Sequence, residues 1–383
     1  MTPALSIAGV TPDRTFVPAD RGELASIVRE LYAAGKTFAF AGGGTELDLG
    51  NPPRPLAAVV RTTALDRVID YSPEDQTITV EAGMKLTTLD AVLAQHDQVL
   101  PIDAGDRQNA TIGGAIATNA FGARRHRYGS IKDLIVGVEI VRPDGVTAHG
   151  GGKVVKNVAG FDLPKLMVGS LGTLGGIASA TFRVFPTPGA TRSVLVQTAP
   201  DRPFFAACMD DRSLEPLAVV HYPALGGVVL TFAGLAAAVE AQLAHLATLA
   251  GAHRTPFALL DRTALERCAA TESAVRTSGE WRWTARANPV RARSAAAASV
   301  PLALEVGYPT LGVTMASAGD GAPMENLVAT RGSSIVFRAM PQRVRGRIDA
   351  WGEPPPSFPL MRALKTNFDP KGLCNPGRYV GGL

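Results

Sequence analysis

The sequence predicts an α+β protein with two domains and a C-terminal segment. Its 383 residues exceed the length at which one hydrophobic core normally suffices, and 46% of them are hydrophobic. Glycines gather in short clusters between Thr111 and Gly176, more densely than core packing requires. Pro186 and Pro188 then interrupt a series of strand-like segments. We expect a first domain over 1–188, an α+β cap domain over 189–352, and a last segment over 353–383 that follows a Pro-rich linker.

Local signals place the first elements. Asp20 with Glu23 is typical of a helix N-cap and its capping partner, and apolar residues then recur at helical spacing until Gly35. This pattern predicts a helix of about 13 residues. Thr87 with Asp90 predicts a second helix N-terminus. Strands are predicted for the short apolar or alternating stretches 37–40, 57–61, 68–71 and 77–81.

The rest of the chain alternates in the same way. In the first domain we expect a hairpin of 134–141 with 146–149, a short helix at 163–168 and a last strand at 177–184. Cap helices are expected at 204–209 and 235–249, a short helix or loop at 295–299, and a final helix at 360–365. Cap strands are expected at 193–197, 217–221, 227–232, from 281, and at 302–306, 311–316 and 334–340. This order favours one antiparallel sheet in the cap.

The glycine clusters indicate a cradle for a phosphate-bearing cofactor. A backbone without Cβ can take positive φ and approach a ligand closely, and its successive N–H groups can form a concave anion site. Gly42-Gly-Gly-Thr45 follows a predicted strand, which suits this geometry. It is not a dinucleotide fingerprint, because Leu47 stands where the last glycine is required, and Glu30 excludes a P-loop ending at Thr37. Taken alone, the turn is also compatible with a purely structural role.

Composition excludes several other classes. The three cysteines, Cys208, Cys268 and Cys374, are too far apart for a disulfide framework, a zinc site or an iron–sulfur site. The net charge is only +4, and the basic cluster Arg124–Arg127 has no aromatic stacking platform, so we expect no nucleic-acid binding. No run of 18 apolar residues and no signal-peptide pattern occurs, so we expect a soluble, cytoplasmic protein without a membrane span.

Several motifs, in a fixed order, carry a family resemblance. They are Gly42-Gly-Gly-Thr45, Thr111-Ile-Gly-Gly114, Gly122-Ala-Arg-Arg125, Tyr128-Gly-Ser-Ile-Lys-Asp133, Gly151-Gly-Lys-Val-Val-Lys-Asn-Val-Ala-Gly-Phe-Asp162, Gly169-Ser-Leu-Gly-Thr-Leu-Gly175, Phe368-Asp-Pro370 and Asn375-Pro-Gly-Arg378. In these motifs the chain resembles the FAD-binding domain of the vanillyl-alcohol-oxidase/p-cresol-methylhydroxylase (PCMH) superfamily. Within it, the nearest resemblance is to the E subunits of bacterial glycolate oxidase. The resemblance implies a two-subdomain PCMH-type FAD-binding domain, an α+β cap domain and a C-terminal tail that returns to the FAD domain.

The resemblance also implies a cofactor site. It carries over FAD contacts to Gly42, Gly43, Gly44, Thr45, Thr111, Gly113, Gly114 and Asn119. Further contacts are carried over to Gly122, Arg124, Thr173, Ile177 and Asn375, the last of them close to the flavin ring. Non-covalent FAD is expected, because residues 1–95 hold no His or Cys where some members link the flavin.

The catalytic residues are less well defined. Oxidation of a 2-hydroxy acid requires a base for the hydroxyl proton and a cation for the carboxylate. The candidate bases are His126 and His221, each with a packing or surface role as its alternative. The candidate cations are Arg124, Arg125, Arg127, Arg282 and Arg286. Related D-lactate and D-2-hydroxyglutarate dehydrogenases carry Gly-Asp-Gly-Asn-x-His and a cap metal site. Here Gly319-Asp-Gly-Ala322 lacks the Asn and the His, and no histidine follows His253, so no metal is expected.

Three functions follow from this pattern. The first is an FAD-binding oxidoreductase subunit of a glycolate-oxidase-type complex, partnered by a second FAD-binding subunit and an iron–sulfur subunit. It would take part in oxidising a small 2-hydroxy acid, glycolate to glyoxylate, and in relaying electrons, and the complex could bring it to the inner-membrane surface. The second is a self-sufficient FAD-dependent 2-hydroxy acid oxidase or dehydrogenase. The third is a structural subunit without redox activity.

Acid precipitation tests the expected mode of cofactor attachment. Because the linking histidine is absent, denaturation in acid should release a yellow supernatant whose flavin is identified as FAD by chromatography. Flavin that stays in the pellet, or FMN in the supernatant, would contradict the expectation.

Overall fold

The computed structural model describes residues 5–152, 162–286, 304–319 and 335–383. The chain divides into two compact units. The first unit contains Met1–Phe121, Gly129–Pro186 and Phe337–Leu383, and the second contains Gly122–Tyr128 and Thr187–Val336. The three-part division expected from the sequence stays a prediction, and the stretch 295–299 lies outside the described residues.

The first unit begins with a small parallel sheet and one long helix. The sheet has the order β1-β3-β2, with β1 at Arg14–Phe16, β2 at Phe38–Ala41 and β3 at Ala58–Arg61. Helix α1 (Arg21–Ala33) connects β1 to β2. The Asp20 side chain accepts a hydrogen bond from the Glu23 N–H at 2.8 Å, so the predicted N-cap is confirmed. The apolar face of α1 packs on β2 and β3 in a buried core.

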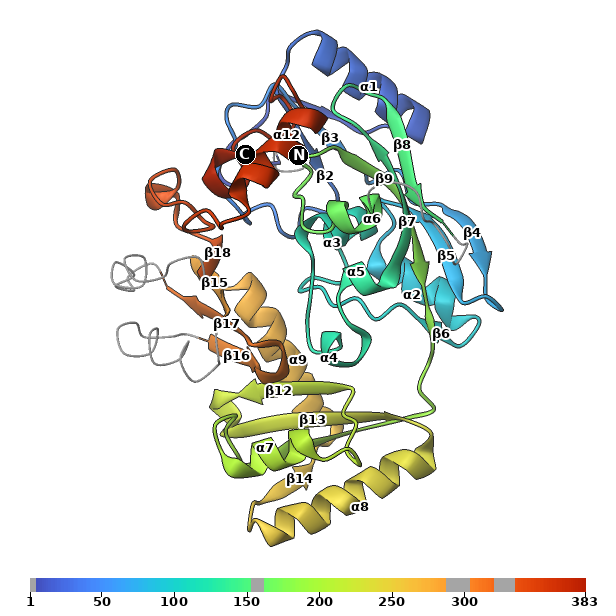
Figure 1. Cartoon of the computed structure of the whole chain (residues 1–383), viewed down its shortest axis with the longest axis vertical. Coiled ribbons are helices and arrows are strands. Elements are labelled where there is room, and N and C mark those ends of the chain that lie inside the picture. The colour runs from blue at the N-terminus through green and yellow to red at the C-terminus, as the bar shows by residue number, and fades with distance from the viewer. Residues whose placement is uncertain (1–4, 153–161, 287–303, 320–334) are drawn as a thin grey trace. The chain divides into compact units, whose positions relative to one another are not determined.

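A five-stranded antiparallel sheet forms the rest of this unit's framework. Figure 1 shows β7, β8 and β9 lying side by side in it, and the strand order is β4-β5-β9-β7-β8. Its strands are β4 (Val68–Ser72), β5 (Thr77–Glu81), β7 (Ile135–Val141), β8 (Thr147–Gly151) and β9 (Gly176–Arg183). The shorter elements around it are α2 (Leu86–Ala94), β6 (Gln98–Val99), α3 (Ile112–Thr118), α5 (Ile131–Leu134), α6 (Leu163–Met167) and β10 (Phe185–Pro186).

The C-terminus returns to this unit, as the resemblance implied. Helix α12 (Phe358–Phe368) precedes a tail that pairs with the edge of β2. The Phe38 N–H donates to the Leu373 carbonyl at 2.9 Å, and the Asn375 N–H donates to the Phe38 carbonyl at 2.6 Å. The tail is therefore part of the same folded unit as the first strands.

The second unit is built on an eight-stranded sheet, which helices accompany. The strand order of the sheet is β14-β11-β13-β12-β16-β17-β15-β18. The strands of this sheet are β11 (Ala190–Val196), β12 (Ala218–Tyr222), β13 (Gly227–Gly234), β14 (Phe257–Leu259), β15 (Trp281–Arg286), β16 (Leu304–Tyr308), β17 (Val313–Ala318) and β18 (Ile335–Ala339). The division between the units falls within β18, after Val336. The helices of the second unit are α4 (Arg125–Tyr128), α7 (Pro203–Asp210), α8 (Ala236–Ala252) and α9 (Arg262–Thr277). Helix α8 packs on β11 and β13, and α9 packs on β16 and β17.

One local expectation differs from the structure, and one helix was not expected. The N-cap of α2 is Lys85, without a side-chain cap, and Thr87 and Asp90 lie inside the helix. Asp90 instead accepts from the Arg107 guanidinium at 2.6 and 2.8 Å, a contact that its spacing in the sequence does not reveal. Helix α9 was not predicted, although Asp261 caps it by accepting from the Ala264 N–H at 2.7 Å.

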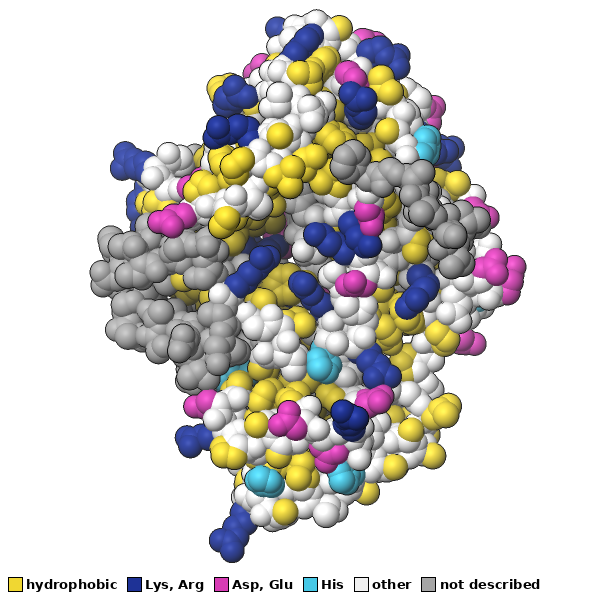
Figure 2. All heavy atoms as spheres, in the orientation of Figure 1, with side chains coloured by type: hydrophobic (Ala, Val, Ile, Leu, Met, Phe, Trp, Pro, Cys, Tyr) yellow, Lys and Arg dark blue, Asp and Glu magenta, His cyan; other side chains and the backbone are white. Residues whose placement is uncertain are grey.

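The surface has mixed charge. On the face drawn in Figure 2, basic side chains have acidic ones among them, in keeping with a net charge of +4. Within the described part of the chain, no helix has both the length and the apolar character needed to cross a membrane.

The three thiols should be inert in the folded protein. All three are buried and free of disulfides. Burial raises the pKa of Cys208 to about 11 and that of Cys374 to about 12, and it raises the pKa of Cys268 as well. At pH 8 each thiol therefore stays more protonated than an ordinary cysteine. Ellman's reagent should titrate no thiol rapidly in native protein and all three after denaturation. Fast reaction of one thiol without unfolding would contradict this packing.

Candidate functional site

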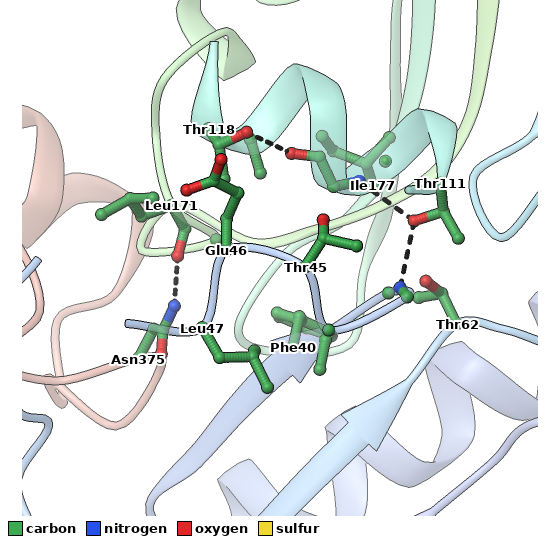
Figure 3. Close-up of a pocket in the computed structure, with 18 of the residues that line it drawn as sticks. Phe40, Thr45, Glu46, Leu47, Thr62, Thr111, Thr118, Leu171, Ile177 and Asn375 are labelled. Atoms are coloured by element: carbon green, nitrogen blue, oxygen red, sulfur yellow. Dashed lines mark hydrogen bonds between the residues drawn. The ribbon is translucent and has the colours of Figure 1, made fainter. Parts of the chain in front are cut away.

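A cavity in the first unit collects most of the glycine motifs. It encloses about 760 Å³, its open mouth included, which lies within the usual range for small-molecule sites. The walls come from the loop after β2, helix α3, the loop before β9 and the C-terminal tail. Figure 3 shows Thr45 and Glu46 from the first loop below Thr118 of α3, and Asn375 at the left, joined by a hydrogen bond to Leu171.

The loop after β2, which we call the glycine loop (42–47), presents unused backbone donors. Gly44 has a φ of +84°, a conformation that glycine adopts without strain. Among the described residues, none accepts a hydrogen bond from the backbone N–H groups of Gly44, Thr45 and Glu46. Because these N–H groups are successive and lie on the cavity wall, they can bind an anionic group of a ligand.

Thr111 fastens the glycine loop to helix α3. As the N-cap of α3, its hydroxyl accepts from the N–H groups of Gly43 and Gly114, each at 3.4 Å, as Figure 3 shows. The Gly113 N–H donates to the Ala82 carbonyl at 2.7 Å. These donors at the N-terminus of α3 are therefore already used within the protein, whereas those of Gly44, Thr45 and Glu46 are free among the described residues.

Packing within the protein explains several glycines that the sequence assigned to ligand contact. A Cβ on Gly42 would lie 2.1 Å from Thr111 Oγ1, and one on Gly43 only 1.6 Å from the Asn109 carbonyl oxygen. A Cβ on Gly113 would lie 2.9 Å from that of Ala82. These glycines let the walls of the cavity meet. At Gly113, packing within the protein does require glycine, contrary to the expectation for the clusters between Thr111 and Gly176. Gly114 differs, because a Cβ there would meet only Thr111 Oγ1, at 3.2 Å.

The loop before β9 contributes a strained leucine to the cavity wall. Leu171 lies on the cavity with a φ of +50°, which is unusual for a bulky residue. Its N–H donates to the Ala117 carbonyl at 2.9 Å, and its carbonyl accepts from Asn375 Nδ2. Two hydrogen bonds thus hold this residue in place, one from α3 and one from the tail.

Asn375 offers an unused acceptor on the cavity wall. It is 4% exposed and also lies in the left-handed region, with a φ of +48°. Its Nδ2 donates to Leu171, while its buried Oδ1 has no partner. A buried amide oxygen without a partner costs free energy, which a ligand N–H would offset.

Two ion pairs neutralise the acidic side chains beside the glycine loop. Glu46 pairs with Arg338 at 2.8 Å, and Asp48 pairs with Arg345 at 2.7 Å. The negative charges next to the free N–H groups are therefore compensated, so they oppose an anionic ligand less.

The cavity unites most of the predicted cofactor residues. Those that line it are Gly42, Gly43, Gly44, Thr45, Thr111, Gly113, Gly114, Ile177 and Asn375. Asn119 ends α3 in the left-handed region, and Thr173 is buried with its hydroxyl donating to the Ser170 carbonyl at 2.7 Å; neither lines the cavity. Gly122 and Arg124 belong to the second unit. These four stay predictions. Sequence reasoning missed Glu46, Leu171 and Arg378, which also line the cavity.

The catalytic candidates lie in the second unit. Helix α4, which carries His126, packs against β12, which carries His221. Burial, followed by the charge of Arg127, lowers the pKa of His126, so its imidazole is neutral at pH 7. His221 is 6% exposed and lines a separate cavity of about 1060 Å³, mouth included, together with Arg202 and His253. Arg282 donates to the Arg276 carbonyl.

A family model confirms the predicted fold and cofactor. Residues 12–151 match the family described as the FAD binding domain. The first unit therefore contains an FAD-binding domain of the PCMH type, with FAD as its cofactor. The solved structure of alkyldihydroxyacetonephosphate synthase has the same fold, with a TM-score of 0.70 at 17% identity, over 96% of this chain and 77% of that one.

Curated relatives match over part of their length. The chain is 33% identical to D-2-hydroxyglutarate dehydrogenase of Xanthomonas citri pv. viticola, over 47% of this chain and 38% of the relative. It is 32% identical to glycolate oxidase subunit GlcD of Bacillus subtilis, over 48% of this chain and 39% of the relative. It is 38% identical to glycolate oxidase subunit GlcE of Escherichia coli, over 33% of this chain and 37% of the relative. The matches thus span less than half the length of each relative.

The cavity suits FAD on its own evidence. The free N–H groups of Gly44, Thr45 and Glu46 can bind phosphate oxygens, and Asn375 Oδ1 can accept from a ring N–H. The glycines bring these groups close to one another without filling the space between them. The residues present therefore fit a cofactor with both an anionic and an amide-like part.

Valine substitutions at the paired glycines separate cofactor contact from packing. Gly114→Val adds bulk on the cavity wall without a backbone clash, so FAD affinity should fall at least about 10-fold while apoprotein melting changes little. Gly113→Val, which clashes with Ala82, should lower both. Flavin fluorescence titration and thermal denaturation measure the two effects.

Gly251→Val provides the control, because it lies in helix α8 with open space around the added Cβ. It should leave FAD affinity unchanged. Equal losses of flavin and of folded apoprotein in Gly114→Val would make that glycine purely structural.

Proposed function

We propose that this chain is an FAD-dependent oxidoreductase that acts as the FAD-binding subunit of a glycolate-oxidase-type complex. The observation that carries the proposal is the cavity of the FAD-binding domain, with free N–H groups on one wall and the Asn375 amide on another. Relatives named glycolate oxidase subunits GlcD and GlcE support the substrate class, a small 2-hydroxy acid such as glycolate. The partners would be a second FAD-binding subunit and an iron–sulfur subunit.

The division of labour follows from what each group can do. Bound FAD supplies a two-electron acceptor, whose chemistry belongs to the cofactor. The glycine loop and the tail bind and orient it. An arginine can hold the substrate carboxylate but cannot take the hydroxyl proton, since its pKa lies above about 12. His126, which is neutral at pH 7, could accept that proton.

The subunit role is favoured over autonomous activity by a feature of the sequence. Gly319-Asp-Gly-Ala322 lacks the Asn and the His of the related dehydrogenase segment, and no histidine follows His253. The alternative is a self-sufficient 2-hydroxy acid dehydrogenase, which relatives named D-lactate and D-2-hydroxyglutarate dehydrogenase support. A structural subunit without redox activity fits less well, because the cavity keeps its FAD-binding groups.

Anaerobic flavin reduction distinguishes these functions. Glycolate, D-lactate and D-2-hydroxyglutarate are mixed in turn with the isolated holoprotein and with the complex copurified from the native host. Loss of oxidised-flavin absorbance is followed in each mixture. We expect slow or no bleaching of the isolated chain and fast, saturable bleaching of the complex.

Rapid bleaching of the isolated chain would favour the self-sufficient enzyme, and His126→Ala and His221→Ala would then identify the base. A chain that holds FAD but does not bleach in either form would support the structural alternative.

A further inference from the structure

Arg378 is a buried cation on the cavity wall without an acidic partner. It is 3% exposed and lines the cavity. Its Nη1 donates to the Asn51 carbonyl at 3.0 Å, and its Nη2 donates to the carbonyls of Leu47, at 3.1 Å, and Leu49. Its Nε is buried with no partner. Among the described residues, no carboxylate forms an ion pair with Arg378, and the nearby Glu46 and Asp48 pair with Arg338 and Arg345 instead.

The guanidinium nevertheless carries its charge at neutral pH. Burial lowers the pKa of Arg378 to about 10, the charge of Arg345 acts in the same direction, and Asp48 opposes both. Neutral carbonyls satisfy some of its N–H groups but do not balance the charge. A buried charge without a counter-ion is costly, because the charge has lost its hydration. An anion delivered by a ligand would offset this cost.

The position of Arg378 identifies that anion. The three carbonyls that hold its guanidinium belong to residues 47–51, which directly follow the free N–H groups of the glycine loop. The cation and these donors therefore lie at the same part of the cavity wall. We propose that Arg378 binds the diphosphate of FAD, completing an anion site whose other half is the glycine loop. This assignment needs only the FAD-binding domain and is independent of the substrate.

Two substitutions separate the charge from the hydrogen bonds. Arg378→Lys keeps a positive charge but cannot span the three carbonyls, whereas Arg378→Gln keeps an N–H donor without the charge. Affinities for FAD and for riboflavin, which has no phosphate, are measured by flavin fluorescence over a range of NaCl concentrations. In Arg378→Gln we expect FAD affinity to fall at least about 10-fold, with a weaker salt dependence, and riboflavin affinity to stay within about 2-fold. Arg378→Lys should retain FAD within about 10-fold of the parent chain.

Arg276→Gln serves as the control for losing a buried arginine. Arg276 is 8% exposed and lies in the second unit. Its Nη2 donates to the Tyr308 hydroxyl at a distance of 2.9 Å, and it does not line this cavity. FAD and riboflavin affinities that fall by the same factor in Arg378→Gln would overturn the proposal and leave Arg378 as a support for residues 47–51. If that variant does not fold, Arg378→Lys decides: retained FAD binding supports the proposal, and loss of both flavins overturns it.

Discussion

The cofactor cavity depends on the buried ion pair between the Lys365 ammonium and Asp369. Lys365 is 9% exposed and bonds to Asp369 Oδ2 at 2.7 Å and to the carbonyls of Thr173 and Cys374, each at 2.8 Å. Asp369 in turn accepts from the N–H groups of Leu373 and Cys374. One ion pair thus joins helix α12, the loop before β9 and the tail. Removing one partner of such a pair typically costs about 3–5 kcal/mol, because the other charge stays buried.

That network decides where two walls of the cavity lie. With the tail fixed, Asn375 reaches the carbonyl of Leu171, a residue that would not keep a positive φ without support. The fixed tail also lets Arg378 reach the carbonyls of Leu47, Leu49 and Asn51. The groups that face the cofactor are therefore held by residues that do not face it, which is the usual arrangement for a preorganised site.

The sequence best predicted features that depend on residues close together in the chain. Asp20 and Glu23 lie three residues apart, and this spacing, with the apolar periodicity that follows it, located helix α1. The same logic failed at Thr87, where Asp90 is engaged by Arg107, and it overlooked Asp261 before α9. The glycine loop was found because glycine clusters are unusual in composition. Arg378 was missed because its partners lie more than 300 residues earlier, and no local pattern records such a contact.

The FAD-binding family match ends at residue 151, yet the cavity does not. Asn375 and Arg378 come from the tail, and Leu171 comes from a loop beyond the matched region. Binding to a folded cavity stabilises every segment that forms it, by about 2.7 kcal/mol when the ligand is at 100 times its Kd. FAD therefore stabilises the docked tail as well as the glycine loop. By the same linkage, a chain whose tail is undocked binds FAD more weakly, so folding of the C-terminus and cofactor capture are a single coupled equilibrium.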